Sequence, residues 1–303
     1  MSNTKKIMIT GAGGFLGGEL LNQIIEDTDY FAVAITSQPH KLYDKFGKKR
    51  LVCYSFEDIN KNAINWKDID VIVHCAFARS YDAKSLAEAI KITNNLFVTA
   101  KEMGVKSIIN ISSQSVYGQI NKAPWQENFE LSPDSLYAMA KYSTEKLLEN
   151  VIYNESIWGT NIRLSSLLGV GFDVRLVNKF VIQALKEEPI KIVGGNQKLS
   201  FMDIRDAATG ILALIKTDFK KWKNVYNLGC EWRHSIIEIA EIVKEIAKEY
   251  NKNVKIVIEE KDVYLDSGMD STLFYKDTGW KPKYNMKDIV KNLFDYLLED
   301  RND

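Results

Sequence analysis

Net charge is the first thing that this 303-residue sequence lacks, because 40 Lys and Arg residues balance 40 Asp and Glu residues. A neutral chain has no overall field to attract a nucleic-acid backbone or an anionic membrane surface. It also has no stretch near the ~18 consecutive apolar residues that a membrane-spanning helix needs. We therefore expect neither nucleic acid nor a membrane among its partners.

Cysteine, proline and histidine are also scarce. The three cysteines, Cys53, Cys75 and Cys230, sit in or beside apolar runs, and no pair has CxxC or metal-ligand spacing. This predicts buried thiols in a reducing compartment and no metal site. The apolar run after the N-terminal lysines is too short for a secretory signal. We expect a cytoplasmic protein.

What the sequence does have is a globular composition, with 46% hydrophobic residues, and an alternation of two hydrophobic periods in its first half. Strand-like runs cover residues 6–10, 31–36, 50–54, 70–76, 105–112 and 161–165. Helical patterns cover 14–26 and 82–103, and Ser132-Pro133-Asp134 opens another long helix. This alternation predicts an α/β fold with a doubly wound parallel sheet.

The pattern changes after about residue 166. Helices are expected near 174–186, 206–216, 235–249 and 288–299, with short strands at 190–193, 225–228 and 254–258. We expect a smaller, discontinuous substrate domain (about 166–198 and 230–303) over the carboxyl ends of the sheet. The dinucleotide-binding Rossmann domain then comprises 1–165 and about 199–229.

A glycine-rich loop joins the first strand to the first helix. It reads Thr10-Gly11-Ala12-Gly13-Gly14-Phe15-Leu16-Gly17. Gly11 allows a sharp turn, Gly14 allows backbone N–H groups to approach a pyrophosphate, and Gly17 allows close packing of the helix. A glycine triplet in this strand–loop–helix context predicts dinucleotide binding.

The second strand lacks the acidic residue that usually follows it. The chain there reads Thr36-Ser37-Gln38-Pro39-His40-Lys41. A carboxylate would bind the adenosine ribose of NAD and repel the 2′-phosphate of NADP. NADP is therefore slightly favoured over NAD, with Ser37, His40 and Lys41 as candidate phosphate contacts. A loop folded away from the cofactor is the alternative.

A second constellation combines a serine-rich strand end with a Tyr–Lys pair. Ser112 and Ser113 end the fifth strand, and Tyr137 and Lys141 follow on a helix. The i, i+4 spacing places the two side chains on one helix face. A nearby cation favours the phenolate of a tyrosine, which then acts as a base near neutral pH.

Together, the TGxxGxxG loop, the SSxxVYG strand end and the YxxxK helix resemble the extended short-chain dehydrogenase/reductase family, in its NAD-dependent epimerase/dehydratase branch. The resemblance continues in Ser200–Asp206 and Gly279–Pro282. It implies that Tyr137 is the acid/base, that Lys141 lowers its pKa and holds the nicotinamide ribose, and that Ser113 binds the substrate oxygen. The residues expected to hold the dinucleotide are Gly11, Gly14, Phe15, Leu16, Gly17, Thr36, Ser37, Lys41, Ala76, Phe77, Ala78, Ser112, Tyr137, Lys141 and Leu164.

Departures from the family pattern narrow the expected reaction. The positions of the Asp–Glu pair of 4,6-dehydratases carry Gln114 and Ser115, which cannot shuttle a proton as a carboxylic acid does. This disfavours a dehydratase and leaves hydride transfer at one sugar carbinol or ketone, by a 4-epimerase or a 4-ketoreductase. The resemblance implies a nucleotide-linked sugar, although two arginines that often hold the nucleotide in this branch are absent. The candidate substrate contacts are Arg79, Gln114, Ser166, Asn178 and Lys179.

Two further alternatives stay open. A non-catalytic NAD(P)-binding sensor or scaffold would share the glycine loop without performing the reaction. A homodimer would pair through the two long helices, near residues 82–103 and 133–150.

Overall fold

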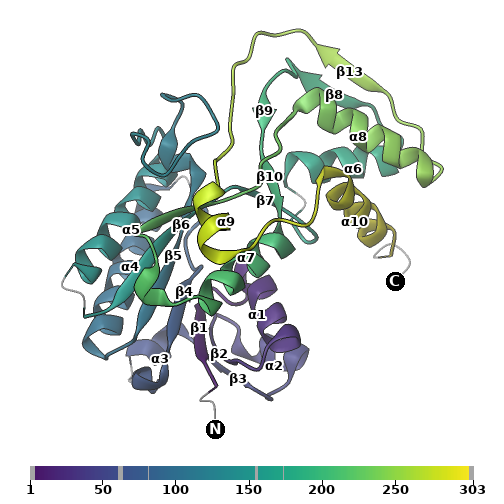
Figure 1. Cartoon of the computed structure of the whole chain (residues 1–303). Helices are drawn as coiled ribbons and strands as arrows, with labels where there is room; N and C mark the ends of the chain where they lie inside the picture. Colours follow the sequence, from purple (N-terminus) through teal and green to yellow (C-terminus); the bar gives the residue numbers. More distant parts are fainter. Residues whose placement is uncertain (1–3, 61–63, 81, 154–155, 173, 300–303) are drawn as a thin grey trace.

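The computed structural model describes residues 4–60, 64–80, 82–153, 156–172 and 174–299 (Figure 1). Seven parallel strands form one sheet in the order β11-β6-β5-β4-β1-β2-β3. The sheet strands are β1 (Lys6–Thr10), β2 (Phe31–Ile35), β3 (Leu51–Tyr54), β4 (Val71–His74), β5 (Ser107–Ser113), β6 (Trp158–Leu164) and β11 (Val225–Leu228). The prediction of a doubly wound parallel α/β sheet is confirmed.

Helices cover both faces of this sheet (Figure 1). The described α-helices are α1 (Phe15–Asp27), α2 (Pro39–Phe46), α3 (Phe56–Asn60), α4 (Ala83–Glu102), α5 (Leu136–Ile152), α6 (Leu176–Leu185), α7 (Ile204–Lys216), α8 (Ile236–Glu249), α9 (Thr272–Thr278) and α10 (Met286–Glu299). None of these described helices combines the length and apolar character needed to cross a bilayer.

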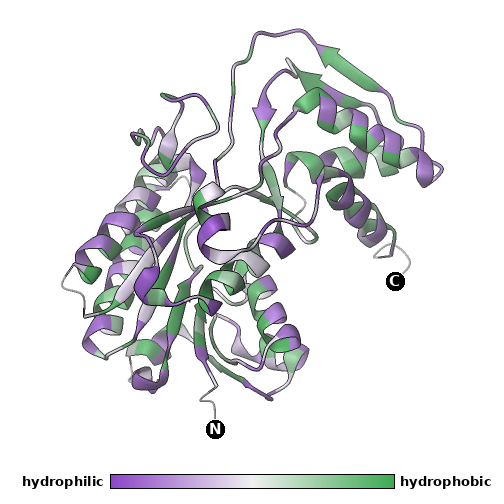
Figure 2. Ribbon diagram, viewed as in Figure 1, coloured by the Kyte–Doolittle hydropathy of each residue, from purple (hydrophilic) through white to green (hydrophobic). Residues whose placement is uncertain are grey.

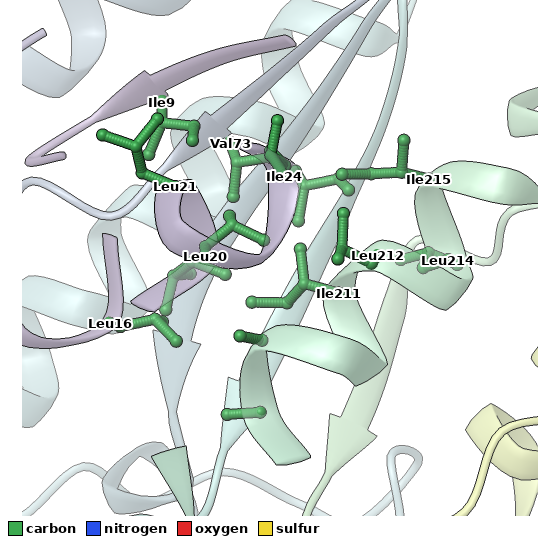
Figure 3. Close-up of a cluster of buried hydrophobic side chains, with 14 of the residues drawn as sticks. Ile9, Leu16, Leu20, Leu21, Ile24, Val73, Ile211, Leu212, Leu214 and Ile215 are labelled. Carbon is green, nitrogen blue, oxygen red and sulfur yellow. The ribbon is translucent and has the colours of Figure 1, made fainter. Parts of the chain in front are cut away.

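The two faces follow from the two-residue period of the strands. In β1, Ile7 and Ile9 belong to the core beneath α1 and α7, whereas Met8 belongs to the core beneath α4 and α5. Figure 3 shows the first core, with Leu20 and Ile24 of α1 close to α7. Burying each such side chain contributes roughly 1.5–3 kcal/mol. The sheet therefore holds α1, which carries the glycine loop, and α5, which carries Tyr137, on opposite faces.

Two boundaries differ from the sequence prediction. The helix that contains Tyr137 begins at Leu136 and not at the Ser132-Pro133-Asp134 motif, because Ser135 caps it by accepting a hydrogen bond from the backbone N–H of Ala138. The segment after β2, which we expected to be a loop, forms the short helix α2 with Pro39 in its first turn.

A second core lies beside the sheet (Figure 1). It joins α6, α8 and α10 to the two-stranded pair formed by β8 (Ile190–Val193) and β13 (Ile256–Glu259). Figure 2 shows hydrophobic and hydrophilic residues alternating along these helices, as expected where one face is buried. The remaining short strands are β7 (Ser166–Leu168), β9 (Lys198–Leu199), β10 (Phe201–Asp203) and β12 (His234–Ser235).

The expected division into two domains stays a prediction. The chain ends that it includes, residues 1–3 and 300–303, lie outside the described residues. Phe274 and Tyr275 of α9 pack in the core of the large sheet, although we assigned residues 230–303 to the smaller domain. Part of the segment that we assigned to the smaller domain therefore packs with the larger one.

Candidate active site

The glycine loop has the shape of a phosphate cradle. Gly11 has a φ of +68°, and a Cβ atom there would lie 2.9 Å from the backbone of Ala76, which follows β4. A Cβ atom on Gly17 would lie 2.3 Å from the carbonyl oxygen of Gly11. A side chain at position 17 would therefore clash with the glycine loop, and not with the sheet as we expected. Gly14 caps α1 without a side-chain bond. Because the helix N-terminus is uncapped by a side chain, its N–H groups can bind a pyrophosphate.

A cavity of about 870 Å³ extends from this loop to the end of β2. Its lining includes Thr36, Ser37 and Lys41, which we expect to contact the dinucleotide, and also Lys45, which we did not predict. Lys41 and Lys45 are exposed and stand one turn apart on α2. The cavity therefore offers hydroxyl groups and two cations where an NAD-binding site usually has a carboxylate.

Lys141 is fixed from α5 onto β5. Its Nζ donates a hydrogen bond to the carbonyl oxygen of Ile111 at 2.7 Å and lies 4.1 Å from the centroid of the Phe77 ring. Burial lowers the pKa of Lys141 to about 7, against the opposing effect of Cys75 and Glu145. Since Ile111 and Ser113 lie two residues apart on β5, Lys141 and Ser113 belong to the same edge of the sheet.

Tyr137 lies one helical turn before Lys141. Burial raises its pKa, while the positive charges of Arg79 and Arg175 and a hydrogen bond with Arg79 act in the opposite direction. The Phe77 ring lies edge-on to Tyr137, with 6.2 Å between ring centroids. The Tyr137 phenol therefore lies in a partly apolar site. The two arginines that lower its pKa, Arg79 and Arg175, lie outside α5.

The two serines at the end of β5 have different surroundings. The Ser113 hydroxyl accepts hydrogen bonds from the backbone N–H and the hydroxyl of Ser115, at 3.2 and 3.0 Å. Ser112, expected among the dinucleotide contacts, donates its hydroxyl to Glu145 at 2.5 Å. The Ser112 side chain therefore points to Glu145 within the protein, and its hydroxyl hydrogen is already used in that hydrogen bond.

Glu145 belongs to a buried ion pair behind the site. It binds Arg163 of β6 through two hydrogen bonds, at 2.8 and 3.1 Å. Arg163 also donates to the Tyr117 hydroxyl at 3.0 Å, and Tyr117 donates to Asn227 of β11 at 2.7 Å. This network connects α5 to β6, to the turn that contains Tyr117 and to β11.

His74 has a structural environment. Its ring nitrogens lie 2.7 Å from the Thr10 hydroxyl and 2.9 Å from the Thr93 hydroxyl. Burial lowers the pKa of His74 to about 3, so the imidazole is neutral. Among the described residues, no group of three or more His, Cys, Asp or Glu side chains is arranged to hold a metal ion.

The expected substrate contacts fall into two groups. Gln114 donates its amide N–H to the Ser166 hydroxyl at 3.1 Å, and Asn178 donates to the carbonyl oxygen of Gly169 at 3.2 Å. Arg79 is exposed and lies beside Tyr137. Lys179 is also exposed.

The remaining expected cofactor contacts lie around the same sheet edge. Phe77 contacts Tyr137 and Lys141, and Ala76 and Ala78 flank it in the segment after β4. Leu164 is buried at the end of β6, in the core of the large sheet.

Sequence reasoning missed an aromatic cluster over the glycine loop. Phe172 stacks on Phe15 with 4.9 Å between ring centroids. The guanidinium carbons of Arg79 and Arg175 lie 4.6 and 5.1 Å from the Phe172 centroid. Gly169 and Gly171, which precede Phe172 and have positive φ, were the available signal for a shaped loop here.

Comparisons with known proteins agree with this architecture. A putative UDP-glucose 4-epimerase of Methanocaldococcus jannaschii is 25% identical over 96% of this chain and 98% of its own. The structure of UDP-glucuronic acid 4-epimerase from Bacillus cereus, in complex with UDP-glucuronic acid and NAD, matches with a TM-score of 0.81 at 23% identity, covering 97% of this chain and 99% of that one. UDP-glucose 4-epimerase from Thermotoga maritima, with UDP-glucose, matches with a TM-score of 0.82 at 23% identity, over 98% and 99% of the two chains.

The chain also matches the model of a protein family over most of its length. Residues 7–229 match the NAD dependent epimerase/dehydratase family, a span that contains the glycine loop, Ser113, Tyr137 and Lys141. The resemblance inferred from the motifs is thereby confirmed, and the chain belongs to the NAD dependent epimerase/dehydratase family.

Proposed function

We propose that the protein is an enzyme that transfers a hydride at a sugar carbinol or ketone, acting as a 4-epimerase or 4-ketoreductase on a nucleotide-linked sugar. The observation that carries this proposal is that Ser113 ends β5 while Lys141, one helical turn after Tyr137, binds Ile111 of the same strand. The glycine loop follows β1, a parallel strand of the same sheet, and so lies at the same edge. Similarity to proteins that act on UDP-glucose and UDP-glucuronic acid supports the substrate class.

The chain's own groups divide the chemistry between them. When bound, the nicotinamide exchanges a hydride with the carbinol carbon. Ser113 holds the substrate oxygen, and Tyr137 removes its proton on oxidation and returns it on reduction. Lys141 fixes the nicotinamide ribose. Gln114, which binds Ser166, has no acidic proton to deliver, and this argues against water elimination.

We propose NADP as the preferred dinucleotide, held at its 2′-phosphate by Ser37, Lys41 and Lys45. These residues line the cavity at the end of β2, and no carboxylate follows that strand. NAD is the dinucleotide in the Bacillus cereus complex, so this preference rests on the residues of the present chain alone.

We further propose a homodimer, and a cytoplasmic location for it. Apolar side chains on α4 and α5, including Ile92, Leu136 and Met139, are exposed, and the three cysteines are free, as expected in a reducing compartment.

Turnover of a panel of sugar nucleotides by the wild-type protein and the Tyr137→Phe variant tests the reaction. We expect the variant to lose about 10²–10⁴-fold in kcat, the usual contribution of general acid–base catalysis, while still binding the dinucleotide. An epimerase retains its dinucleotide and needs none added, whereas a reductase consumes it stoichiometrically. Full activity of the variant would refute the mechanism, and binding without any wild-type turnover would favour the non-catalytic sensor.

A further inference from the structure

A second cation, Arg79, lies beside Tyr137 in addition to Lys141. The Lys141 ammonium donates to the carbonyl oxygen of Ile111 at 2.7 Å and packs against the face of Phe77 at 4.1 Å. The Tyr137 side chain instead shares a hydrogen bond with Arg79. The i, i+4 spacing of Tyr137 and Lys141 brings the two residues onto one face, but in this structure it does not make Lys141 the partner of the phenol.

The position of Arg79 is defined by the aromatic cluster over the glycine loop. Its guanidinium carbon lies 4.6 Å from the centroid of Phe172. Phe172 in turn stacks on Phe15, the first residue of α1, with an interplanar angle of 26°. Such cation–π contacts contribute roughly 0.5–2 kcal/mol. The exposed Arg79 is thereby held by Phe172, which itself packs on the first helix residue after the glycine loop.

We propose that Arg79 is a further catalytic residue, a permanent cation that stabilises the phenolate form of Tyr137 when Tyr137 accepts the substrate proton. This inference rests on the proposed function, since it assigns a role within that reaction.

The chemistry of the two cations explains why a second one is useful. Burial lowers the pKa of Lys141 to about 7, so Lys141 loses its charge near neutral pH. A guanidinium stays protonated throughout this range. Arg79 therefore supplies a positive charge to the phenol under conditions in which Lys141 does so only in part.

The other charged and titratable groups around these side chains act in defined directions. Arg175 is the second cation that lowers the pKa of Tyr137. Cys75 and Glu145 raise the pKa of Lys141, while Arg79 lowers it. The neutral His74 also lies near Lys141. Removal of Arg79 therefore raises the pKa of Tyr137 and, in a smaller effect, allows Lys141 to hold its proton at higher pH.

The direct test is the titration of Tyr137 in the Arg79→Met variant. The phenolate absorbance of each protein is measured against the same protein carrying Tyr137→Phe, so that the other tyrosines cancel. We expect the pKa of Tyr137 to rise by at least about one unit, since opposite charges in contact shift a pKa by about 1–3 units. Arg79→Lys should restore most of the shift, and Phe172→Leu should produce a smaller one by loosening Arg79.

The pH–rate profile is the second measurement. In Arg79→Met, kcat for sugar oxidation should fall about tenfold at pH 7 and recover as the pH rises through the new pKa. Lys84→Met is the matched control, because Lys84 is an exposed cation in the first turn of α4, and its titration and profile should equal those of the wild type.

The outcomes separate the inference from the proposed function. An unchanged Tyr137 titration, with only a raised KM for a phosphate-bearing ligand, would make Arg79 a simple anion contact and overturn the inference. A shifted titration in a protein with no turnover of any sugar nucleotide would support the coupling of Arg79 to Tyr137 and contradict the proposed function.

Discussion

Lys141 shows how one buried side chain can favour function at the expense of stability. It is 4% exposed, and its pKa in the folded protein is about 7, whereas an unperturbed lysine has a pKa of about 10.4. Between these two values the unfolded chain binds more protons than the folded chain. The free energy of unfolding contributed by this group therefore rises as the pH rises from about 7 to about 10.

We expect the Lys141→Met variant to be more stable than the wild type at pH 7, with the difference shrinking by about 3 kcal/mol on going to pH 9.5. At pH 7, folding must bury the Lys141 ammonium or remove its proton, and either lowers the free energy of unfolding. This penalty shrinks at high pH, and methionine has no such penalty at any pH. Urea denaturation of both proteins at the two pH values measures the effect, and comparison with the variant cancels the other titrating groups. An equal difference at both values would contradict the low pKa of Lys141.

The residues of the site differ in how far the sequence predicts them. Tyr137 and Lys141 lie four positions apart on one helix, so their common face follows from helix geometry alone. The contact of Arg79 with Phe172 joins positions 93 residues apart by way of two different loops. No local periodicity encodes such a contact, because it depends on how the segment after β7 folds back over α1.

At the scale of single elements, α2 shapes the cavity at the end of β2, where we propose that the adenosine end of the cofactor binds. Because the segment after β2 is helical, Lys41 and Lys45 stand on one face and both line the cavity. In an extended loop, the side chains of these two lysines would not be held on the same side of the chain. This helix was missed because its eight residues are too short a stretch to show a repeated helical period.

The Lys41→Ala/Lys45→Ala double variant tests the preference for NADP. We expect its Kd for NADPH to rise about tenfold or more, because bonds to a charged phosphate contribute about 1.5–3 kcal/mol, while its Kd for NADH changes little. Isothermal titration calorimetry with both dinucleotides measures the two changes. The matched control is Lys48→Ala, because Lys48 lies just beyond α2 and packs against Tyr43. Equal losses for NADPH and NADH would remove the argument for a 2′-phosphate site.

Buried polar contacts between elements are the part of the fold that hydrophobic pattern does not predict. Glu145 and Arg163 belong to α5 and β6, and both are almost inaccessible to solvent. Removing one partner of such a pair costs about 3–5 kcal/mol, because the other charge stays buried. The alternation of strands and helices predicted the sheet, but it could not predict that α5 is held to β6 by an ion pair.

At the scale of the whole molecule, the described residues of α4 and α5 form an exposed apolar surface on the large sheet. The α4 and α5 helices pack side by side on one face of the sheet, and they expose Ile92, Val98, Leu136 and Met139 at 37–50% of their full areas. Exposed apolar side chains gathered on two adjacent helices are typical of a surface that another protein covers. A second copy of the chain would cover the same surface on both protomers, as a two-fold symmetric interface requires.

We therefore expect the wild-type protein to sediment as a dimer and the Met139→Glu variant to sediment as a monomer at micromolar concentration. A carboxylate at the centre of an apolar interface has to be buried without a partner, which costs several kcal/mol. Val257→Glu is the matched control, because Val257 of β13 is exposed to the same extent as Met139, 49%, but lies in the second unit. A monomeric wild type, or a Met139→Glu variant that remains a dimer, would place the interface elsewhere or exclude it.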